Sequence, residues 1–205
     1  MKLANTAATC LYVDASNVYG GLVEILPLGC YLDFGEILAC IREDFVVNRI
    51  KAYGTYLSDE PLASLARRKL IGAQQKFFQT IRDIPEAEFI KGYLSPTSRK
   101  EKGIDVKMAV DMVKDAYDST SLTALIMTGD DDFLYPVICL RNMNIKVHLV
   151  ALGSRLPYGT AHNTNQRVVY DLNDYFISRV LPRLKKPIIN LQVRNLTNRV
   201  RVLSV

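Results

Sequence analysis

Three aspartates follow hydrophobic segments that have the length and composition of buried strands. Asp14 comes directly after residues 10–13, and Asp130 and Asp132 follow residues 125–129. In an open parallel sheet, functional groups gather outside the carboxyl ends of the strands. If these two strands are neighbours, their carboxylates converge, and a divalent cation is needed to offset the repulsion. Oxygen-only ligands suit Mg²⁺ or Mn²⁺ rather than zinc, and such an ion supports phosphodiester hydrolysis.

A fourth aspartate stands near the start of the predicted helix 104–117. Asp105 precedes an apolar stripe at helical spacing that must face the sheet: Met108, Ala109, Met112 and Ala116. An unpaired carboxylate on such a face is costly, so Asp105 needs a cation partner or an opening onto a cleft, unless it caps the helix. The same spacing predicts an outer, solvated face made of Lys107, Asp111, Lys114, Asp115 and Asp118.

Each of these patterns has another interpretation. An Asp-x-Asp sequence after a strand also occurs in sugar-nucleotide transferases and phosphatases, and residues 129–132 could form a turn with a helix cap. A phosphatase with an aspartyl nucleophile would have a second Asp at the position of Ser16. The spacing is not that of an EF-hand loop. Neither a P-loop nor a GxGxxG sequence is present, so a nucleotide cofactor is unsupported.

The formal charge of +5 is unevenly distributed along the 205 residues. Seven basic residues and no acidic one lie from Arg179 onward, which leaves 19 basic and 21 acidic residues before it. We interpret the first part as a mildly acidic body and residues 182–205 as a basic tail, either a docked strand or a disordered arm. The positive surplus fits a polyanionic partner.

Several classes of protein are excluded by composition. The sequence has no run of 18 apolar residues that would span a membrane, and residues 1–9 do not have the pattern of a signal peptide. The four cysteines form no C-x-x-C pair and only two histidines are present, which disfavours a structural zinc site. We therefore expect buried free thiols in a reducing cytoplasm.

Strand-like segments alternate with amphipathic segments along the chain. Strands are predicted at residues 9–13, 50–57, 88–94, 122–128, 145–152 and 168–170. Helices are predicted at residues 33–45, 61–81, 104–117, 133–142 and 174–181. Asp33 is the expected cap of the first helix, and Ser58 or Asp59 of the second, where Pro61 is tolerated. This alternation is typical of an α/β fold whose parallel sheet is covered on both faces.

Three sequence blocks together resemble the NYN domain family of PIN-like ribonucleases. The blocks are Tyr12–Gly20, Lys102–Asp111 and Thr128–Phe133, in the family's order, and the similarity spans about residues 10–177. The sequence departs from the family pattern at Ala15, where Gly is common, and at Asp131, where a small residue is usual.

The resemblance implies a PIN-like three-layer αβα fold with a central, mainly parallel sheet. The domain would cover residues 1–181, and the basic tail, residues 182–205, lies outside the resemblance. The catalytic residues, which would also bind Mg²⁺ or Mn²⁺, are by resemblance Asp14, Asp105, Asp130 and Asp132. The residues expected to contact nucleic acid are Asn17, Lys100, Lys102 and Arg155.

We therefore predict a metal-dependent ribonuclease, an endonuclease that cuts RNA. We expect it in the cytoplasm, without a membrane partner, and a homodimer is one possible arrangement. A second hypothesis is a PIN-like module that binds RNA or a protein partner without catalysis. A third is a glycosyltransferase that uses Asp130 and Asp132, which would leave Asp14 and Asp105 unexplained.

Overall fold

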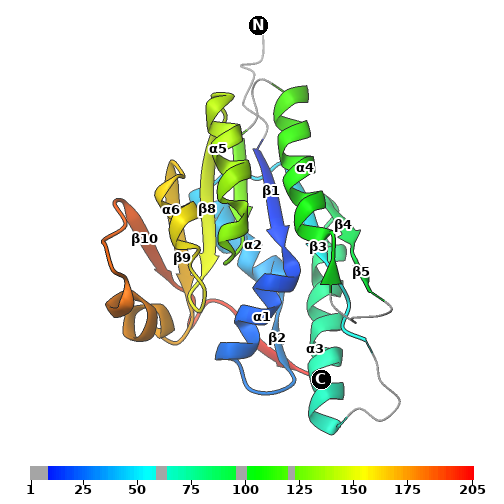
Figure 1. Cartoon of the computed structure of the whole chain (residues 1–205). Coiled ribbons are helices and arrows are strands. Elements are labelled where there is room, and N and C mark those ends of the chain that lie inside the picture. The colour runs from blue at the N-terminus through cyan, green and yellow to red at the C-terminus, as the bar shows by residue number, and fades with distance from the viewer. Residues whose placement is uncertain (1–8, 59–63, 96–100, 120–122) are drawn as a thin grey trace, which may run out of the picture.

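The computed structural model describes residues 9–58, 64–95, 101–119 and 123–205. Its centre is a seven-stranded sheet in the order β10-β9-β8-β7-β1-β3-β4, with every neighbouring pair parallel (Figure 1). The strands are β1 (Thr9–Asp14), β3 (Arg49–Gly54), β4 (Ala87–Lys91), β7 (Thr123–Met127), β8 (Lys146–Leu152), β9 (Gln166–Asp171) and β10 (Leu191–Asn195). The predicted parallel α/β sheet is confirmed.

Helices cover both faces of this sheet and make three layers. One face carries α1 (Ala15–Ile25), α2 (Phe34–Asp44) and α3 (Leu65–Arg82), and the other carries α4 (Ile104–Asp118), α5 (Leu134–Asn142) and the short α6 (Tyr158–His162). Side chains of a strand alternate between the two faces. Leu11 and Val13 of β1 therefore join the core under α1, α2 and α3, whereas Cys10 and Tyr12 join the core under α4 and α5.

Two helices show how the local sequence sets their ends. Asp33 caps α2 as expected, because its carboxylate accepts a hydrogen bond of 2.7 Å from the Gly35 backbone N–H. Helix α3 begins later than predicted, with Ser64 as its cap. Ser64 stands between the predicted start and the first buried residue of the helix, Ile71, and its hydroxyl satisfies the Arg67 N–H. The predicted start at Pro61 and the cap Asp59 lie outside the described residues.

Helix α4 begins at a residue with a left-handed backbone. Gly103, its cap, has φ 74°, a conformation that a residue with a Cβ rarely adopts. It follows a short hairpin of β5 (Tyr93–Leu94) and β6 (Glu101–Lys102). The predicted strand 88–94 is thus divided at Gly92 into β4 and β5.

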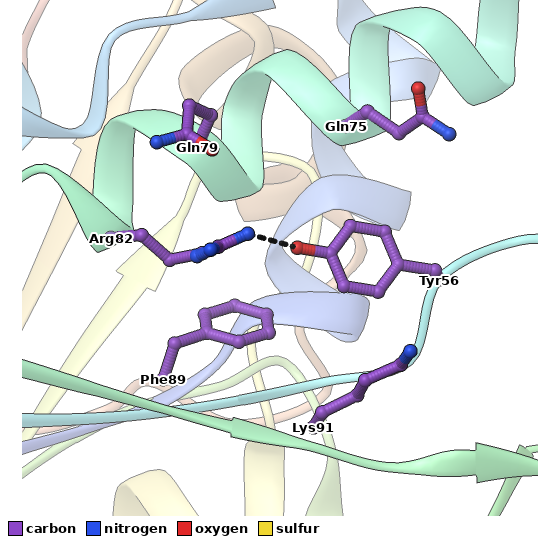
Figure 2. Close-up of a pocket in the computed structure, with 6 residues that line it drawn as sticks. All are labelled: Tyr56, Gln75, Gln79, Arg82, Phe89 and Lys91. Carbon is purple, nitrogen blue, oxygen red and sulfur yellow. Dashed lines mark hydrogen bonds between the residues drawn. The ribbon is translucent and has the colours of Figure 1, made fainter.

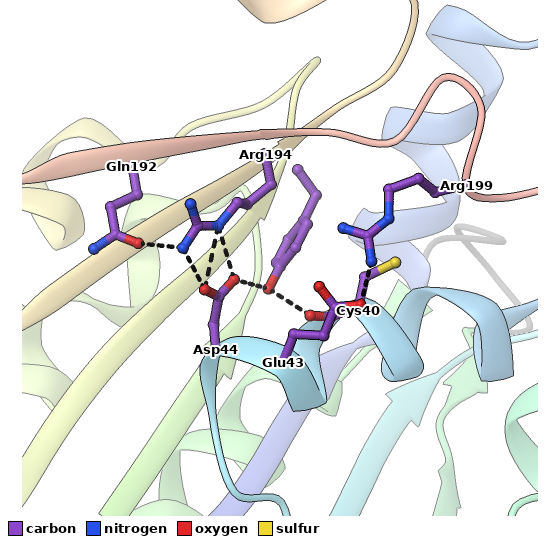
Figure 3. Close-up of polar contacts among 7 residues, drawn as sticks. Cys40, Glu43, Asp44, Gln192, Arg194 and Arg199 are labelled. Atoms are coloured by element: carbon purple, nitrogen blue, oxygen red, sulfur yellow. Dashed lines mark hydrogen bonds and ion pairs between the residues drawn. The ribbon is translucent and has the colours of Figure 1, made fainter.

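The C-terminal residues pack onto the body. The predicted helix 174–181 is a π-helix over Phe176–Val180, followed by a 3₁₀ turn over Leu181–Arg183. Strand β10 then extends the central sheet, and β11 (Val202–Ser204) pairs antiparallel with β2 (Cys30–Leu32). Figure 3 shows arginines of this segment facing acidic residues of α2. Of the two alternatives left open for the tail, these described residues show docked strands.

Candidate active site at the carboxyl edge of the sheet

Asp14 occupies the junction between β1 and α1. Its side chain is buried (4% exposed), and one carboxylate oxygen accepts a hydrogen bond of 3.0 Å from the Asn17 backbone N–H, which caps α1. The other oxygen accepts a hydrogen bond of 3.1 Å from the Thr128 hydroxyl. Strands β1 and β7 are neighbours, with Val13 opposite Met127, so the two residues that follow them meet. The condition that the sequence analysis left open, that these two strands are neighbours, is therefore met.

The acidic segment after β7 is tied to Asp14 through the same threonine. The Asp130 backbone N–H donates to the Thr128 hydroxyl oxygen at 3.1 Å. The Asp130 carboxylate accepts from the Asp132 backbone N–H at 3.0 Å and caps the 3₁₀ turn η1 (Asp131–Phe133). Thr128 therefore holds Asp14 and the backbone of Asp130 at fixed positions relative to one another.

Asp131 has a different position from its two neighbours. Its carboxylate accepts a hydrogen bond of 2.9 Å from the Thr160 backbone N–H at helix α6. A Cβ built on Gly159 would lie 3.4 Å from the Asp131 carboxylate, so the helix packs closely against it. Asp131 thus connects the acidic segment to α6.

Asp105 lies in the first turn of α4 and is exposed. Helix α4 runs from the carboxyl edge of the sheet back toward its amino edge, since Asp111 contacts Tyr53 near the end of β3 and Asp115 contacts Arg49 at its start. The first turn of α4 therefore lies toward the same edge as Asp14. Among the described residues, however, no three His, Cys, Asp or Glu side chains are grouped closely enough to hold a metal ion.

The prediction that Asp111 and Asp115 lie on an outer face of α4 was wrong. Asp111 accepts a hydrogen bond of 2.9 Å from the Tyr53 hydroxyl, and Asp115 one of 2.7 Å from the Tyr12 hydroxyl. Asp115 also pairs with Lys51 at 2.8 Å. Both aspartates follow a buried methionine by three positions, so they flank the apolar stripe and reach the tyrosines that rise from the sheet.

These contacts satisfy polar groups that burial would otherwise leave unpaired. Burial raises the pKa of the Tyr12 hydroxyl, and its hydrogen bond to Asp115 raises it further. Burial likewise raises the pKa of Tyr53, whose partner is Asp111. Both tyrosines stay protonated as hydrogen-bond donors, so the two aspartates fasten α4 to β1 and β3. A helical pattern by itself gave no signal for these partners, because the tyrosines belong to distant strands.

Asn17 shapes the loop that carries the acidic segment. Its side-chain oxygen accepts a hydrogen bond of 2.9 Å from the Gly129 backbone N–H. A Cβ on Gly129 would lie 2.4 Å from the Arg155 Cβ and 2.9 Å from this oxygen, so only glycine fits there. Asn17 thus positions the segment between Thr128 and Asp130, and its proposed contact with nucleic acid stays a prediction.

The cations expected to contact nucleic acid have separate positions. Arg155 pairs with Glu24, with its Nη2 2.6 Å and its Nε 3.0 Å from the same carboxylate oxygen. Lys102 is exposed in β6, directly before the cap of α4. Lys100 lies outside the described residues.

The donor atoms at this edge suit a hard cation. Asp14 and Asp130 offer carboxylate oxygens, and Thr128 offers a hydroxyl oxygen, with no histidine or cysteine among the hydrogen-bond partners described above. Carboxylate oxygens are the ligands that Mg²⁺ and Mn²⁺ take in proteins. The residue types therefore fit the predicted cation.

The seven-stranded parallel sheet with helices on both faces is consistent with a PIN-like three-layer α/β fold. The family model of the NYN domain matches residues 8–181. The chain therefore belongs to the NYN domain family, whose members are PIN-like nucleases.

One solved structure agrees with this fold. A protein of unknown function from Vibrio parahaemolyticus has a TM-score of 0.61 and 20% identity, and the match covers 82% of this chain and 96% of that one. A nicotinamidase from Staphylococcus aureus, with a TM-score of 0.35 and 14% identity over 77% of this chain and 91% of that one, is too distant to carry an inference. No curated protein matches the chain. Within the described residues, no helix is both long enough and apolar enough to cross a bilayer.

Proposed function

We propose that this protein hydrolyses RNA phosphodiester bonds with the help of Mg²⁺ or Mn²⁺. The observation that carries the proposal is the connection of Asp14 to the segment of Asp130 through Thr128, at the carboxyl ends of two adjacent parallel strands. This is the edge where open α/β sheets bind their ligands. Membership of a nuclease family supports the same reading.

The four proposed catalytic aspartates would have different roles according to their positions. Asp14, Asp130 and Asp132 would hold the cation, and Asp105 would contribute from the first turn of α4. When bound, a divalent cation lowers the pKa of a water molecule and stabilises the charge of the leaving oxygen. The buried Asp14 is kept in place by Thr128 and by the N-terminus of α1, so the proposed site needs little rearrangement at that position.

The remaining polar groups would orient the substrate. Asn17 fixes the Gly129 N–H and thereby the path of the acidic loop. Lys102 stands before the N-terminus of α4, where a cation and the positive end of the helix dipole can attract a phosphate. Arg155 would reach a phosphate by leaving Glu24.

The test is cleavage of a labelled single-stranded RNA with Mn²⁺ by purified protein. Asp14→Asn keeps the shape of the side chain and removes its charge, and we expect a loss of about 100-fold or more in the cleavage rate. Asp118→Asn, at the far end of α4, is the matched control and should retain the wild-type rate. Equal rates in wild type and Asp14→Asn, with both folded by circular dichroism, would contradict the site.

Two further measurements separate the finer parts of the proposal. A circular RNA has no ends, so its linearisation requires an endonuclease and its resistance would indicate an exonuclease. A thermal-shift titration with Mn²⁺ reports binding of the ion itself, and the stabilisation should disappear in Asp130→Asn. Binding of RNA without cleavage under any of these conditions would instead support a binding module.

A further inference from the structure

A polar pocket lies on the other face of the sheet from helix α4. It has a volume of about 600 Å³, and the residues that line it are Tyr56, Gln75, Gln79, Arg82, Phe89 and Lys91. Figure 2 shows that they come from three separate segments: the chain after β3, one side of helix α3, and the edge strand β4. None of the residues assigned above to catalysis lines it.

The regular geometry of the two elements brings these side chains together. Gln75, Gln79 and Arg82 are spaced by four and three residues, so they form one stripe along α3. Phe89 and Lys91 are two residues apart on β4 and therefore point to the same face. The pocket is the space between this stripe and this strand.

Two aromatic rings form its floor. The rings of Tyr56 and Phe89 lie 6.0 Å apart, and both pack against Phe78, which is fully buried, at 5.2 Å and 5.1 Å. Phe78 holds the two partly exposed rings in place with their planes tilted by 50° to each other. They form a platform on which a base that stacks on one ring meets the other ring at an angle. A platform of this kind accepts the flat face of a nucleobase, and one stacked base contributes about 1–3 kcal/mol.

The polar groups around the platform are donors and cations. Arg82 donates to the Tyr56 hydroxyl at 3.4 Å, and the Lys91 ammonium lies 5.4 Å from the centre of the Tyr56 ring. Within the part of the chain that the structure describes, neither Arg82 nor Lys91 forms an ion pair, and no carboxylate is among the lining residues. With respect to the described residues, both cations are thus available to phosphates, while the amide of Gln75 can bond to the edge of a base.

We propose that this pocket binds an unpaired nucleotide of a single-stranded RNA, with its base on Tyr56 and Phe89 and its phosphates at Arg82 and Lys91. The proposal rests on the proposed ribonuclease function and adds to it a single-stranded substrate class. It also adds a second contact on that substrate, away from the bond that is cut.

The position of the pocket relative to Asp14 supports one continuous path for such a strand. Asp14 pairs with Tyr53 across β1 and β3, and Tyr53 pairs with Ile90, the residue before Lys91. Strand β1, which ends at Asp14, is therefore two strand spacings, or about 10 Å, from β4. Tyr56 follows β3 at this carboxyl edge, so an RNA strand that crosses the edge reaches both places.

The first test measures binding without cleavage. A fluorescein-labelled single-stranded RNA of about 12 nucleotides is titrated with protein in EDTA and followed by anisotropy. The variant Arg82→Gln/Lys91→Gln should bind roughly tenfold more weakly at low salt, and the slope of log K against log salt should fall by about 1.4. The lost slope reflects two phosphate contacts.

A matched control keeps the net charge of that variant. Lys76→Gln/Lys146→Gln also removes two exposed cations, one from α3 and one from the amino edge of β8. Lys76 shares a side of α3 with Gly72 and Thr80, and this side does not line the pocket. Gly72 is close to Val205, and the Thr80 hydroxyl accepts a hydrogen bond from the Phe34 N–H. This control should bind like the wild type. Equal affinities of the two double variants would overturn the proposal.

A second test reports the base itself. The chain has no tryptophan, so Tyr56→Trp places a unique fluorophore on the platform. Titration with the single-stranded RNA should quench its emission, whereas the same sequence in a duplex should not, because its bases are stacked and paired. Quenching by neither RNA, with binding intact by anisotropy, would overturn the assignment of the base site.

The outcomes also separate this proposal from the ribonuclease itself. Loss of RNA affinity in Arg82→Gln/Lys91→Gln with no cleavage by any variant would leave the pocket standing and contradict the hydrolysis. Metal-dependent cleavage together with equal RNA affinity in both double variants would support the hydrolysis and contradict the RNA site in the pocket. In that second case the pocket would be free for a protein partner, and RNA would not be its ligand.

Discussion

Two basic regions of this molecule use their cations in different ways. The C-terminal segment carries three arginines that pair with acidic residues of α2. Figure 3 shows Arg194 with Asp44 and Arg199 with Glu43. The third pair is Arg201 with Glu36. In the pocket between α3 and β4, Arg82 donates a hydrogen bond to the Tyr56 hydroxyl and Lys91 lies over the Tyr56 ring (Figure 2).

The difference shows that charge counted along a sequence is not the charge offered to a ligand. The tail holds the larger positive surplus, yet three of its arginines are occupied in holding β10 and β11 onto the body. The pocket contributes only two cations, but they stand beside a platform for a base. We therefore expect loss of tail contacts to lower stability and loss of pocket cations to lower RNA affinity.

The largest expected effect comes from the apolar anchor of the tail. Leu196 directly follows β10 and is fully buried in the main core. Leu196→Ala should lower the free energy of unfolding by about 2–5 kcal/mol, because it leaves a cavity that the core cannot fill. Urea denaturation measures the change, and Leu181→Ala, at an exposed position, is the control. Equal effects of the two would show that the tail does not anchor through Leu196.

A smaller effect is expected at the ion pair of Asp44. Its carboxylate accepts from Arg194 at 3.1 Å and from the buried Tyr170 hydroxyl at 2.9 Å. The hydrogen bond from Arg194 is the main cause that lowers the pKa of Asp44 below its ordinary value of 3.8. Asp44→Asn should cost about 1–2 kcal/mol at neutral pH.

The pH dependence of this difference follows from the lowered pKa. A carboxyl whose pKa falls on folding contributes stability that is complete above its unfolded pKa and is lost as the pH falls through the folded pKa. The stability gap between wild type and Asp44→Asn should therefore be constant at neutral pH and shrink as the pH falls below 3.8 and through the lower folded-state pKa. A gap that grows in acid would show that the ion pair is not its source.

The smallest effect is expected for RNA binding by the outer arginines. Arg199→Gln/Arg201→Gln removes two charges that are already paired with Glu43 and Glu36. RNA affinity in EDTA should stay within about twofold of wild type, in contrast to the loss for Arg82→Gln/Lys91→Gln. An equal loss in both double variants would mean that the two basic regions bind RNA alike.

The order of elements could be predicted because its signals are local. Alternating apolar segments marked the strands, and Asp33 marked the start of α2. The placement of Asp14 and Asp130 at strand ends followed from the same pattern, and the adjacency of β1 and β7 then brought them to one edge. The start of α3 and the orientation of Asp111 were mispredicted, because a cap and a distant tyrosine decided them.

The pocket between α3 and β4 gave no sequence signal. Its glutamines and Arg82 are ordinary exposed helix residues by pattern, and Phe89 and Lys91 are ordinary residues of a strand. Only the packing of α3 beside the edge strand, with Phe78 beneath, places them around one space.

The sequence by itself determined most of the strands and helices of the central sheet and that aspartates follow two of the strands, because periodicity and capping act over a few residues. The tertiary structure decided which charged side chains form ion pairs or hydrogen bonds within the protein and which can contact a ligand. Arg194 and Asp44 are 150 residues apart in the chain, and Tyr12 and Asp115 are 103 apart. Such pairs depend on the order of strands in the sheet, which no local pattern encodes.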